Sequence, residues 1–183
     1  MINPYLPVGK RKGRGPELAT DTVEAIMDAA ERRMRMAGYG GFSFRDVAAD
    51  VGVKSASVHY HFPTKDGLVA AVARRYNDRI IAAVEREREG GADVVRAWHA
   101  VFRKALAGGM CLCGALGVTS GDLSPEALAE VRRFFEIAIG SLMDGWLTRA
   151  RAAEVFATLE GAILMASVRG DETLFEAATA SLL

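Results

Sequence analysis

The stretch 43–65 constrains the fold most, because it holds two short helical patterns with almost no chain between them. The first pattern follows Ser43, whose side chain can cap a helix, and stops at Gly52, which can take the left-handed conformation that ends one. The second pattern, over residues 55–61, is too short to be independent, and a Phe-Pro pair ends it. Two short helices joined by a sharp turn are typical of a helix-turn-helix, whose second helix lies in the major groove of DNA.

Longer helical patterns flank this stretch on both sides. From Asp21 to Gly38 the apolar residues follow helical spacing, and Asp21 with Glu24 forms an N-terminal capping pair. Thr64 then caps a long helix with apolar residues in i, i+4 register. The apolar positions are Val23, Ile26, Met27, Ala30, Met34 and Ala37 before the motif, and Leu68, Val72, Tyr76, Ile80 and Val84 after it.

The residue types of the second short helix suit a DNA-reading role. Gly52 makes the turn, Val53 fills the space between the two helices, and Ala56 and Ser57 are small enough for close approach to DNA. Polar side chains there offer hydrogen bonds at groove depth, and longer ones reach the flanking phosphates, which fix register without reading sequence. We predict base contacts from Lys54, Ser55, Ser57 and His59 and phosphate contacts from Arg45, Tyr60, His61 and Lys65, with Ala56 and Thr64 completing the interface.

Over residues 20–80 the chain resembles the DNA-binding domain of the TetR (TetR/AcrR) family of bacterial transcriptional regulators. The resemblance is carried by the segment GFSFRDVAADVGVKSASVHYHFPTKDGLVAAV. The family's helix cap corresponds to Ser43, its Arg-Asp pair to Arg45-Asp46 and its Ala-x-x-x-Gly-Val turn to Ala48 to Val53. The aromatic-rich end of its recognition helix corresponds to His59 to Phe62, and its Phe-Pro-x-Lys junction to Phe62 to Lys65. Two positions depart from the family pattern: Lys54 stands where a Ser or Thr usually follows Gly-Val, and His59 stands where a tyrosine is common.

Length and composition fit a globular protein. Half of the 183 residues are apolar, which is enough for a sizeable core, and two cysteines are too few for a disulfide scaffold. The chain has no run of about twenty uncharged apolar residues and no apolar run typical of a signal peptide at its start. We therefore expect no membrane partner and a cytoplasmic protein in a bacterium, associated with the nucleoid when it is bound to DNA.

Positive charge is concentrated at the front of the chain. Residues 1–65 hold ten Lys or Arg against seven Asp or Glu, a net charge of plus three, and residues 66–183 hold thirteen against sixteen, a net charge of minus three. Four of the cations lie in residues 10–14. We predict a basic flexible arm over residues 1–19 that touches phosphates or a minor groove, with a solvated tail as the alternative.

The second half also reads as helix throughout. A stripe from Val94 to Leu106 is followed by a Cys-Leu-Cys segment, a cap and proline at Ser124-Pro125, and a long helix. A last pair of helices, about 153–169 and 171–182, is separated at Gly170-Asp171. The fold class is therefore all-α: a three-helix helix-turn-helix domain over residues 20–66 and a helical bundle over residues 67–183.

The family resemblance implies that the bundle binds a small effector and forms a homodimer through its last two helices. The apolar positions of the helix at 153–169 are broader than one core stripe needs, so some can pack across a two-fold axis, although the helix could instead be buried within its own subunit. A dimer would supply the second half-site of a palindromic operator. The predicted dimer residues are Phe156, Leu159, Ile163 and Leu164.

Aromatic and thioether side chains of the bundle are candidates for lining the effector pocket, where they suit a flat or apolar ligand. The same residue types also form ordinary cores. His99 could be a polar group in the pocket or a histidine satisfied in the core. The candidate lining is Trp98, Phe102, Met110, Cys111, Phe134, Phe135, Met143 and Trp146.

The segment Met110 to Gly114 resembles the Gly-Cys-Leu-x-Gly opening of the sixth helix in one branch of the family, some members of which respond to electrophiles or oxidants. A thiolate at a helix N-terminus with a second thiol two residues away would be its physical basis, so Cys111 and Cys113 are candidate redox residues. The alternative is that both are buried and act as small hydrophobes. Two cysteines and a distant histidine do not make a metal site.

The sequence thus predicts a transcriptional regulator, in the first place a repressor that a small molecule releases from its operator. A thiol-based switch is the alternative, and an activator would use the same parts. No catalytic grouping or cofactor motif is present, so neither an enzyme nor a cofactor is expected. The segment 147–153 is shorter than the loop between the corresponding helices of the family, so these helices are either nearly continuous or separated by residues that the sequence lacks.

Overall fold

The computed structural model describes residues 16–183, with side chains described from Thr20 onward. Within that range the chain forms nine α-helices and four short 3-10 turns, and no strand, so the all-α prediction is confirmed. The helices are α1 (Pro16–Ala37), α2 (Phe44–Val51), α3 (Ser55–His61), α4 (Lys65–Glu89), α5 (Val94–Ala105), α6 (Leu112–Gly117), α7 (Pro125–Asp144), α8 (Arg149–Arg169) and α9 (Thr173–Thr179).

The first helix begins earlier than the capping pair at Asp21 predicted. Helix α1 starts at Pro16, and proline is favoured in a first turn because its missing N–H has no partner to lose there. Of the predicted basic arm over residues 1–19, residues 1–15 lie outside the described part, and the remaining four belong to α1.

The predicted helix ends around the motif are confirmed. Ser43 and Asp46 form a reciprocal capping box at the start of α2, and Gly52 ends that helix at φ 74°, in the left-handed region. Thr64 Oγ1 accepts a hydrogen bond from the Gly67 N–H and caps α4. Lys54 occupies the cap position of α3 without a side-chain hydrogen bond, as its departure from Ser or Thr implies.

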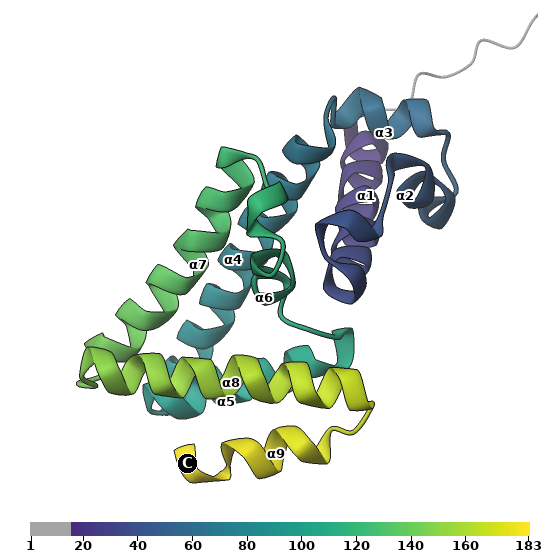
Figure 1. The fold of residues 1–183 in the computed structure, drawn as a ribbon. Helices are drawn as coiled ribbons and strands as arrows, with labels where there is room; N and C mark the ends of the chain where they lie inside the picture. The colour runs from purple at the N-terminus through teal and green to yellow at the C-terminus, as the bar shows by residue number, and fades with distance from the viewer. Residues whose placement is uncertain (1–15) are drawn as a thin grey trace, which may run out of the picture.

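The helices form two groups joined by α4 (Figure 1). Helices α1, α2 and α3 cluster at one end, and α4 leads from them into the second group, where it packs along α7 and α5. Helix α8 crosses this group and packs on α9, α7 and α5. The predicted boundary between residues 66 and 67 falls in the first turn of α4, which contacts both groups, so the division into domains remains a prediction.

Charged side chains fasten α1 to α4. Arg75 on α4 donates to Glu24 at 2.6 Å and to Asp28 at 2.7 Å, and these acidic partners raise the pKa of its guanidinium. Burial opposes that rise. Glu31, which is buried on α1, also pairs with Arg75 at 3.4 Å. The two groups are therefore held in a defined relative position by a network rather than by one contact.

Helices α7 and α8 are separate and joined by a tight connection. Only residues 145–148 link Asp144 to Arg149, and Thr148 caps α8 by accepting from the Arg151 N–H. Trp146 adopts φ 71° in this turn, a backbone conformation that a bulky residue rarely takes. The two helices are therefore not continuous.

No helix in the described part of the chain combines the length and apolar character needed to cross a membrane.

Candidate nucleic-acid interface and ligand cavity

Helix α3 is held by one side and open on the other. Val58 is fully buried beneath it, and Val53 in the preceding turn packs against the same core. Phe44 on α2 meets the ring of His59 edge-on at 4.7 Å between ring centroids. Because α3 is only seven residues long, these contacts fix the orientation that an isolated helix of this length could not keep.

The open side of α3 carries most of the predicted DNA-binding residues. Lys54, Ala56, His59 and Tyr60 are exposed, and Tyr60 is 82% exposed although it is a large aromatic residue. Beside them, Ser55, Ser57 and His61 are half-buried, and Arg45 on α2 is exposed. The structure thus brings small, polar and aromatic residues together on one surface that could enter a groove.

Lys65 does not belong to that surface, contrary to the prediction. Its ammonium donates a 2.8 Å hydrogen bond to the Phe42 carbonyl and lies over the rings of Tyr39 and Phe42, at 4.4 and 4.5 Å from their centroids. Burial lowers the pKa of Lys65. A long cationic side chain at the start of α4 is here used to join α4 to the turn before α2. Thr64 is exposed, but its hydroxyl oxygen already serves as the cap of α4.

Ion pairs and hydrogen bonds fix α2 against α1 and α4. Arg33 on α1 donates to both carboxylate oxygens of Asp50, at 2.6 and 2.8 Å, and this lowers the pKa of Asp50. Tyr39 Oη donates to Asp66 at 2.7 Å, and this bond raises the pKa of Tyr39. These contacts therefore hold the helices that carry the surface of α3 against α1 and the start of α4.

Four of the predicted pocket residues belong to an aromatic cluster in the core. Trp98 contacts Phe134 and Phe156 edge-on at 6.2 and 5.5 Å, and Trp98 Nε1 donates to Ser141. These rings pack against one another and fill the space between α5, α7 and α8. The structure therefore favours the interpretation that they are core side chains over the interpretation that they line a pocket. The four are Trp98, Phe102, Phe134 and the half-buried Phe135.

Two other predicted pocket residues face solvent. Trp146 is 98% exposed and Met143 is 40% exposed. Met143 lies in the last turn of α7, beyond the core, and Trp146 lies in the connection after the helix, so the helical stripe predicted from the sequence extends too far along the chain. The structure does not bring them to a pocket with Met110 and Cys111.

Met110 and Cys111 do line a cavity, of about 220 Å³, between the start of α6 and the middle of α8. Its other lining residues are mostly apolar, and Glu160 is its one charged lining residue. Sequence analysis missed Glu160. The signal for it was present, because Glu160 lies four residues after Phe156 and three before Ile163, the spacing of the buried side of α8.

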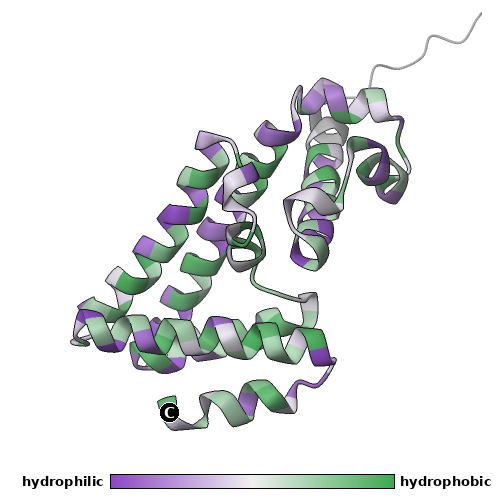
Figure 2. Cartoon of the chain, viewed as in Figure 1, coloured by the Kyte–Doolittle hydropathy of each residue, from purple (hydrophilic) through white to green (hydrophobic). Residues whose placement is uncertain are grey.

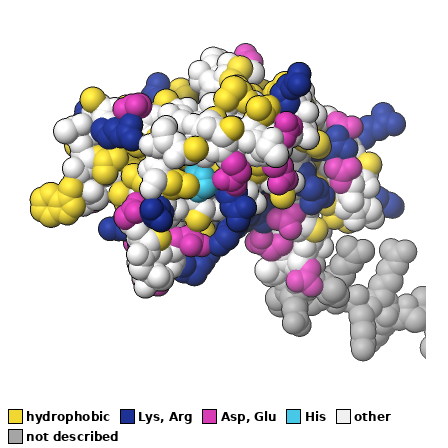
Figure 3. Space-filling view, turned by 90° about the horizontal axis from the view of Figure 1, so that it is seen from below, with side chains coloured by type: hydrophobic (Ala, Val, Ile, Leu, Met, Phe, Trp, Pro, Cys, Tyr) yellow, Lys and Arg dark blue, Asp and Glu magenta, His cyan; other side chains and the backbone are white. Residues whose placement is uncertain are grey.

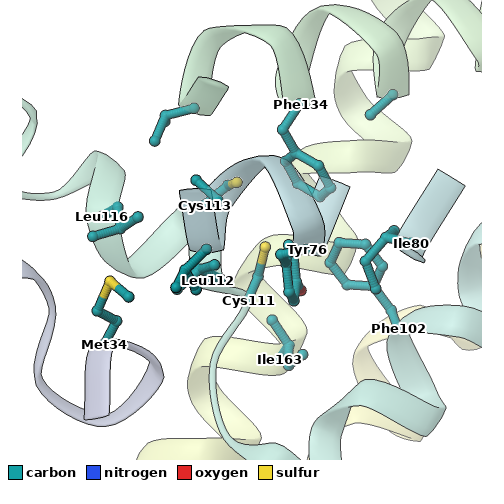
Figure 4. Packing of buried hydrophobic residues seen from close by; sticks show 14 of the residues in the cluster. Met34, Tyr76, Ile80, Phe102, Cys111, Leu112, Cys113, Leu116, Phe134 and Ile163 are labelled. Carbon is teal, nitrogen blue, oxygen red and sulfur yellow. The ribbon is translucent and has the colours of Figure 1, made fainter. Parts of the chain in front are cut away.

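Both thiols are buried in hydrophobic packing, and Figure 4 shows Cys111 beside Tyr76 and Ile163. Burial raises the pKa of Cys111 and of Cys113 well above the ordinary value, and the nearby Glu160 carboxylate adds to both shifts. A reactive thiolate needs the opposite environment, so the structure does not favour the redox hypothesis. Cys113 donates its S–H to Asn77 at 3.3 Å, as a structural residue does.

His99 is a histidine satisfied in the core and not a polar group of the pocket, which is the second of the two possibilities given for it. Its Nε2 lies 3.0 Å from Thr179 Oγ1, and that hydroxyl donates to the Phe175 carbonyl. Because the hydroxyl has only one hydrogen to give, Nε2 must carry the proton and donate to Oγ1. Burial lowers the pKa of His99, which is consistent with a neutral ring.

Three of the four predicted dimer residues are buried within the single chain. Phe156, Leu159 and Ile163 are at most 3% exposed, so their reading as dimer contacts is wrong. On α8 the exposed apolar side chains are instead Leu164, Met165 and Val168, at 47%, 48% and 75%. Figure 2 shows hydrophobic residues recurring along the whole of α8, which therefore has an outer apolar strip, defined by residues 164, 165 and 168, besides its buried side.

A helix-turn-helix with an open second helix, joined by one long helix to a bundle that holds a cavity, is the architecture of the helix-turn-helix regulatory proteins. One family of such regulators is similar to this chain in sequence and in fold. Residues 26–72 match the model of the bacterial regulatory proteins of the tetR family. Among solved structures, a TetR-family transcriptional regulator from Agrobacterium tumefaciens superposes with a TM-score of 0.81 at 27% identity, over 90% of this chain and 96% of that one. A TetR regulator from Legionella pneumophila gives 0.78 at 26% identity, over 93% and 97%. The helix-turn-helix part of the chain thus matches the TetR family, and the fold of the whole described chain is that of TetR-family regulators.

A curated relative is also similar in part. The nicotine-responsive transcriptional repressor HdnoR of Paenarthrobacter nicotinovorans is 31% identical over 82 residues, which is 45% of this chain and 42% of that protein. The match thus spans less than half of either chain.

Proposed function

We propose that this protein is a ligand-responsive, sequence-specific DNA-binding transcriptional regulator, in the first place a repressor that leaves its operator when a small molecule binds. The observation that carries the proposal is the exposed surface of α3 around Ala56, His59 and Tyr60, fixed from below by Val58. A surface of small and hydrogen-bonding residues on a rigid short helix suits the major groove. The match of residues 26–72 to the tetR family model and the similarity to the repressor named above support the same activity.

Two features support a homodimer: the small size of the exposed surface of α3 and the outer apolar strip of α8. One helix of seven residues contacts few base pairs, and a two-fold partner would double the contact and define a palindrome. The strip of Leu164, Met165 and Val168 is the surface we assign to the partner, together with α9, which packs on α8. Figure 3, seen from the α9 side, shows hydrophobic side chains among charges of both signs.

Ligand binding would act on DNA through α6 and α1. Helix α6, which carries part of the cavity wall, packs against α1, and α1 is joined to α2 by Arg33 and Asp50. A ligand that fits only one position of α6 would favour one orientation of the two α3 helices in a dimer. If that orientation does not match successive major grooves, the ligand causes release.

The DNA-binding surface is tested by placing a charge on it. Ala56→Glu puts a carboxylate on the exposed side of α3, and Ala82→Glu puts the same group on the exposed side of α4, away from it. Binding to a labelled mixed-sequence duplex at low salt should weaken by about tenfold or more for Ala56→Glu, because phosphates repel the added charge. Ala82→Glu should bind like the unaltered protein. Equal binding by all three would reject the α3 surface.

The dimer is tested on the outer strip. Val168→Glu should convert the protein to a monomer in sedimentation equilibrium, since a charge would be buried in an apolar interface. Ala82→Glu is again the matched control. A dimer that survives Val168→Glu and Leu164→Glu would place the partner elsewhere.

A further inference from the structure

The cavity between α6 and α8 contains an acidic group without a charged partner. Oε1 of Glu160 is buried and has no hydrogen-bond partner among the described residues. None of the ion pairs between described side chains includes Glu160, although other acidic residues of the bundle are paired. A buried polar atom without a partner costs free energy, and a ligand that satisfied it would recover that cost.

The chain keeps room for this carboxylate. A Cβ atom built on Gly114, in α6, would lie 2.7 Å from Glu160 Oε2, which is closer than real Cβ atoms approach. A larger residue at this position would therefore force the carboxylate of Glu160 to shift from the place it takes here. The remaining lining is apolar, with Met110 and Ile163 on its sides and Leu164 and Val118 among the exposed or partly exposed residues of its edge.

Among the described residues, no positively charged side chain lines the cavity, and the nearby guanidinium of Arg35 is bound to backbone carbonyls, including that of Met110. Burial raises the pKa of Glu160 to about 7, and a hydrogen bond with Cys111 is the one opposing influence. The ionisable groups that face it, the thiols of Cys111 and Cys113, have pKa values raised in turn by its charge. From α7, Glu130 acts on Cys113 with the same sign as Glu160. The ionisable groups at the site, Glu160 and the two thiols, are thus each either neutral or negative.

We propose that this cavity binds a small, mainly apolar organic monocation, such as a protonated amine, with the positive group donating to Oε1 of Glu160. A volume of about 220 Å³ holds roughly seven waters at about 30 Å³ each, which restricts the ligand to a small one. In its ionised form Glu160 disfavours anions, and a neutral ligand would leave that charge uncompensated. That such a cation is the effector rests on the proposed function, whereas its binding does not.

Calorimetry with matched probes tests the site in the full-length protein. A series of small primary amines that begins with 2-phenylethylamine is titrated at pH 7 alongside the alcohol of the same shape for each, such as 2-phenylethanol. At least one amine should bind at least about tenfold more tightly than its alcohol, since a charge-assisted hydrogen bond to a buried carboxylate is among the strong ones. Binding should also release protons from Glu160, which appears as a buffer-dependent heat.

Two variants on α8 test whether the preference for the amine and the proton release depend on Glu160. Glu160→Gln keeps the shape and removes the charge, so the preference for the amine and the proton release should both disappear. Glu154→Gln changes an exposed acid on the same helix, which pairs with Arg151, and should leave both unchanged. Circular dichroism checks that each variant is folded. Amines that bind no better than alcohols across the series, or equal amine binding by Glu160→Gln, would overturn the proposal.

DNA binding measured on the same samples separates the two proposals. Amine binding through Glu160 with DNA release supports both. Amine binding without any DNA binding by the protein supports the cation site and rejects the regulator. DNA binding that persists unchanged at saturating amine supports the regulator and the site but rejects the cation as effector.

Discussion

Arg35 on α1 donates a 2.7 Å hydrogen bond from Nε to the carbonyl oxygen of Met110, a residue that lines the cavity. The same guanidinium donates to the carbonyls of Ala105 at 2.6 Å and Gly109 at 3.1 Å. One buried side chain of the DNA-binding end thus holds three backbone groups of the segment between α5 and α6. This is the most direct physical link between the cavity and α3.

Replacing Arg35 should therefore reduce the effect of ligand binding on DNA affinity and also lower the stability of the fold. Arg35→Met retains the apolar stem but leaves three carbonyls without their donor, and we expect the free energy of unfolding to fall by about 3 kcal/mol. In the folded fraction, DNA affinity in the presence and absence of effector should differ less than in the unaltered protein. Urea unfolding and DNA titrations measure the two effects, and a full effector response in Arg35→Met would contradict this link.

The pKa of Glu160 predicts a pH dependence of stability. Because the folded value of about 7 lies above the ordinary 4.5, the folded state holds a proton that the unfolded state has lost. Stability should therefore fall as pH rises from 4.5 to about 7, by about 3 kcal/mol, and then stop changing for this reason. Urea unfolding of Glu160→Gln should lack this fall and be more stable than the unaltered protein at pH 8. A parallel decline in the variant would refute the assignment to Glu160.

Phe134 and Trp146 should differ sharply although the sequence suggests the same role for both. Phe134→Ala removes a fully buried ring from the aromatic cluster and should cost about 3–5 kcal/mol of stability. Trp146→Ala removes a side chain that is 98% exposed, and should cost less than about 0.5 kcal/mol in the single chain. Thermal unfolding compares them. Similar losses for the two variants would mean that Trp146 is covered.

Lys54 and Lys65 should affect DNA binding in different ways. Lys54 is exposed at the start of α3 and is a predicted base contact, so Lys54→Ala should change which sequence is preferred. Because the variant also removes one positive charge from the interface, the salt slope of DNA binding should fall by about 0.9. Lys65→Met should leave that slope unchanged and reduce stability, because its ammonium is bound to the Phe42 carbonyl. Affinity measured over a range of salt concentrations decides. A lower slope for Lys65→Met would return this residue to the DNA interface.

The two cysteines should be unreactive while the protein is folded. Their buried positions and raised pKa values predict slow modification by an aromatic disulfide reagent at pH 7, with both thiols reacting fully once urea unfolds the chain. DNA release by an effector should persist in a variant with both cysteines changed to serine. Fast reaction of one thiol in the native protein would revive the thiol switch.

Local signals in the sequence were sufficient to predict the DNA-binding end. The cap at Ser43, the turn at Gly52 and the end of α3 before Pro63 depend on neighbours a few residues away, so each could be read from a short segment. The sequence could not predict features that depend on tertiary contacts. The length of the Lys65 side chain predicts a phosphate contact, but the carbonyl of Phe42, distant in sequence, binds its ammonium instead.

Helical spacing also left the two sides of α8 undecided. The pattern 156, 159 and 163 marks one apolar side and 164, 165 and 168 another, and periodicity alone does not say which side faces the core. Packing against α5, α7 and α9 decides it. Glu160 was missed for a related reason, because an acidic residue in a helix is ordinarily exposed, and only the position of α6 shows that this one is not.

Selection of bound sequences from a random duplex pool at near-physiological salt tests whether this protein is a dimeric, sequence-specific DNA-binding regulator. We expect an enriched palindrome whose half-sites lie about one helical turn apart, because two α3 helices related by a two-fold axis would read successive major grooves. Binding to that palindrome should survive an increase in salt better than binding to the starting pool. Recovery of no common sequence, with weak binding that salt abolishes, would contradict it.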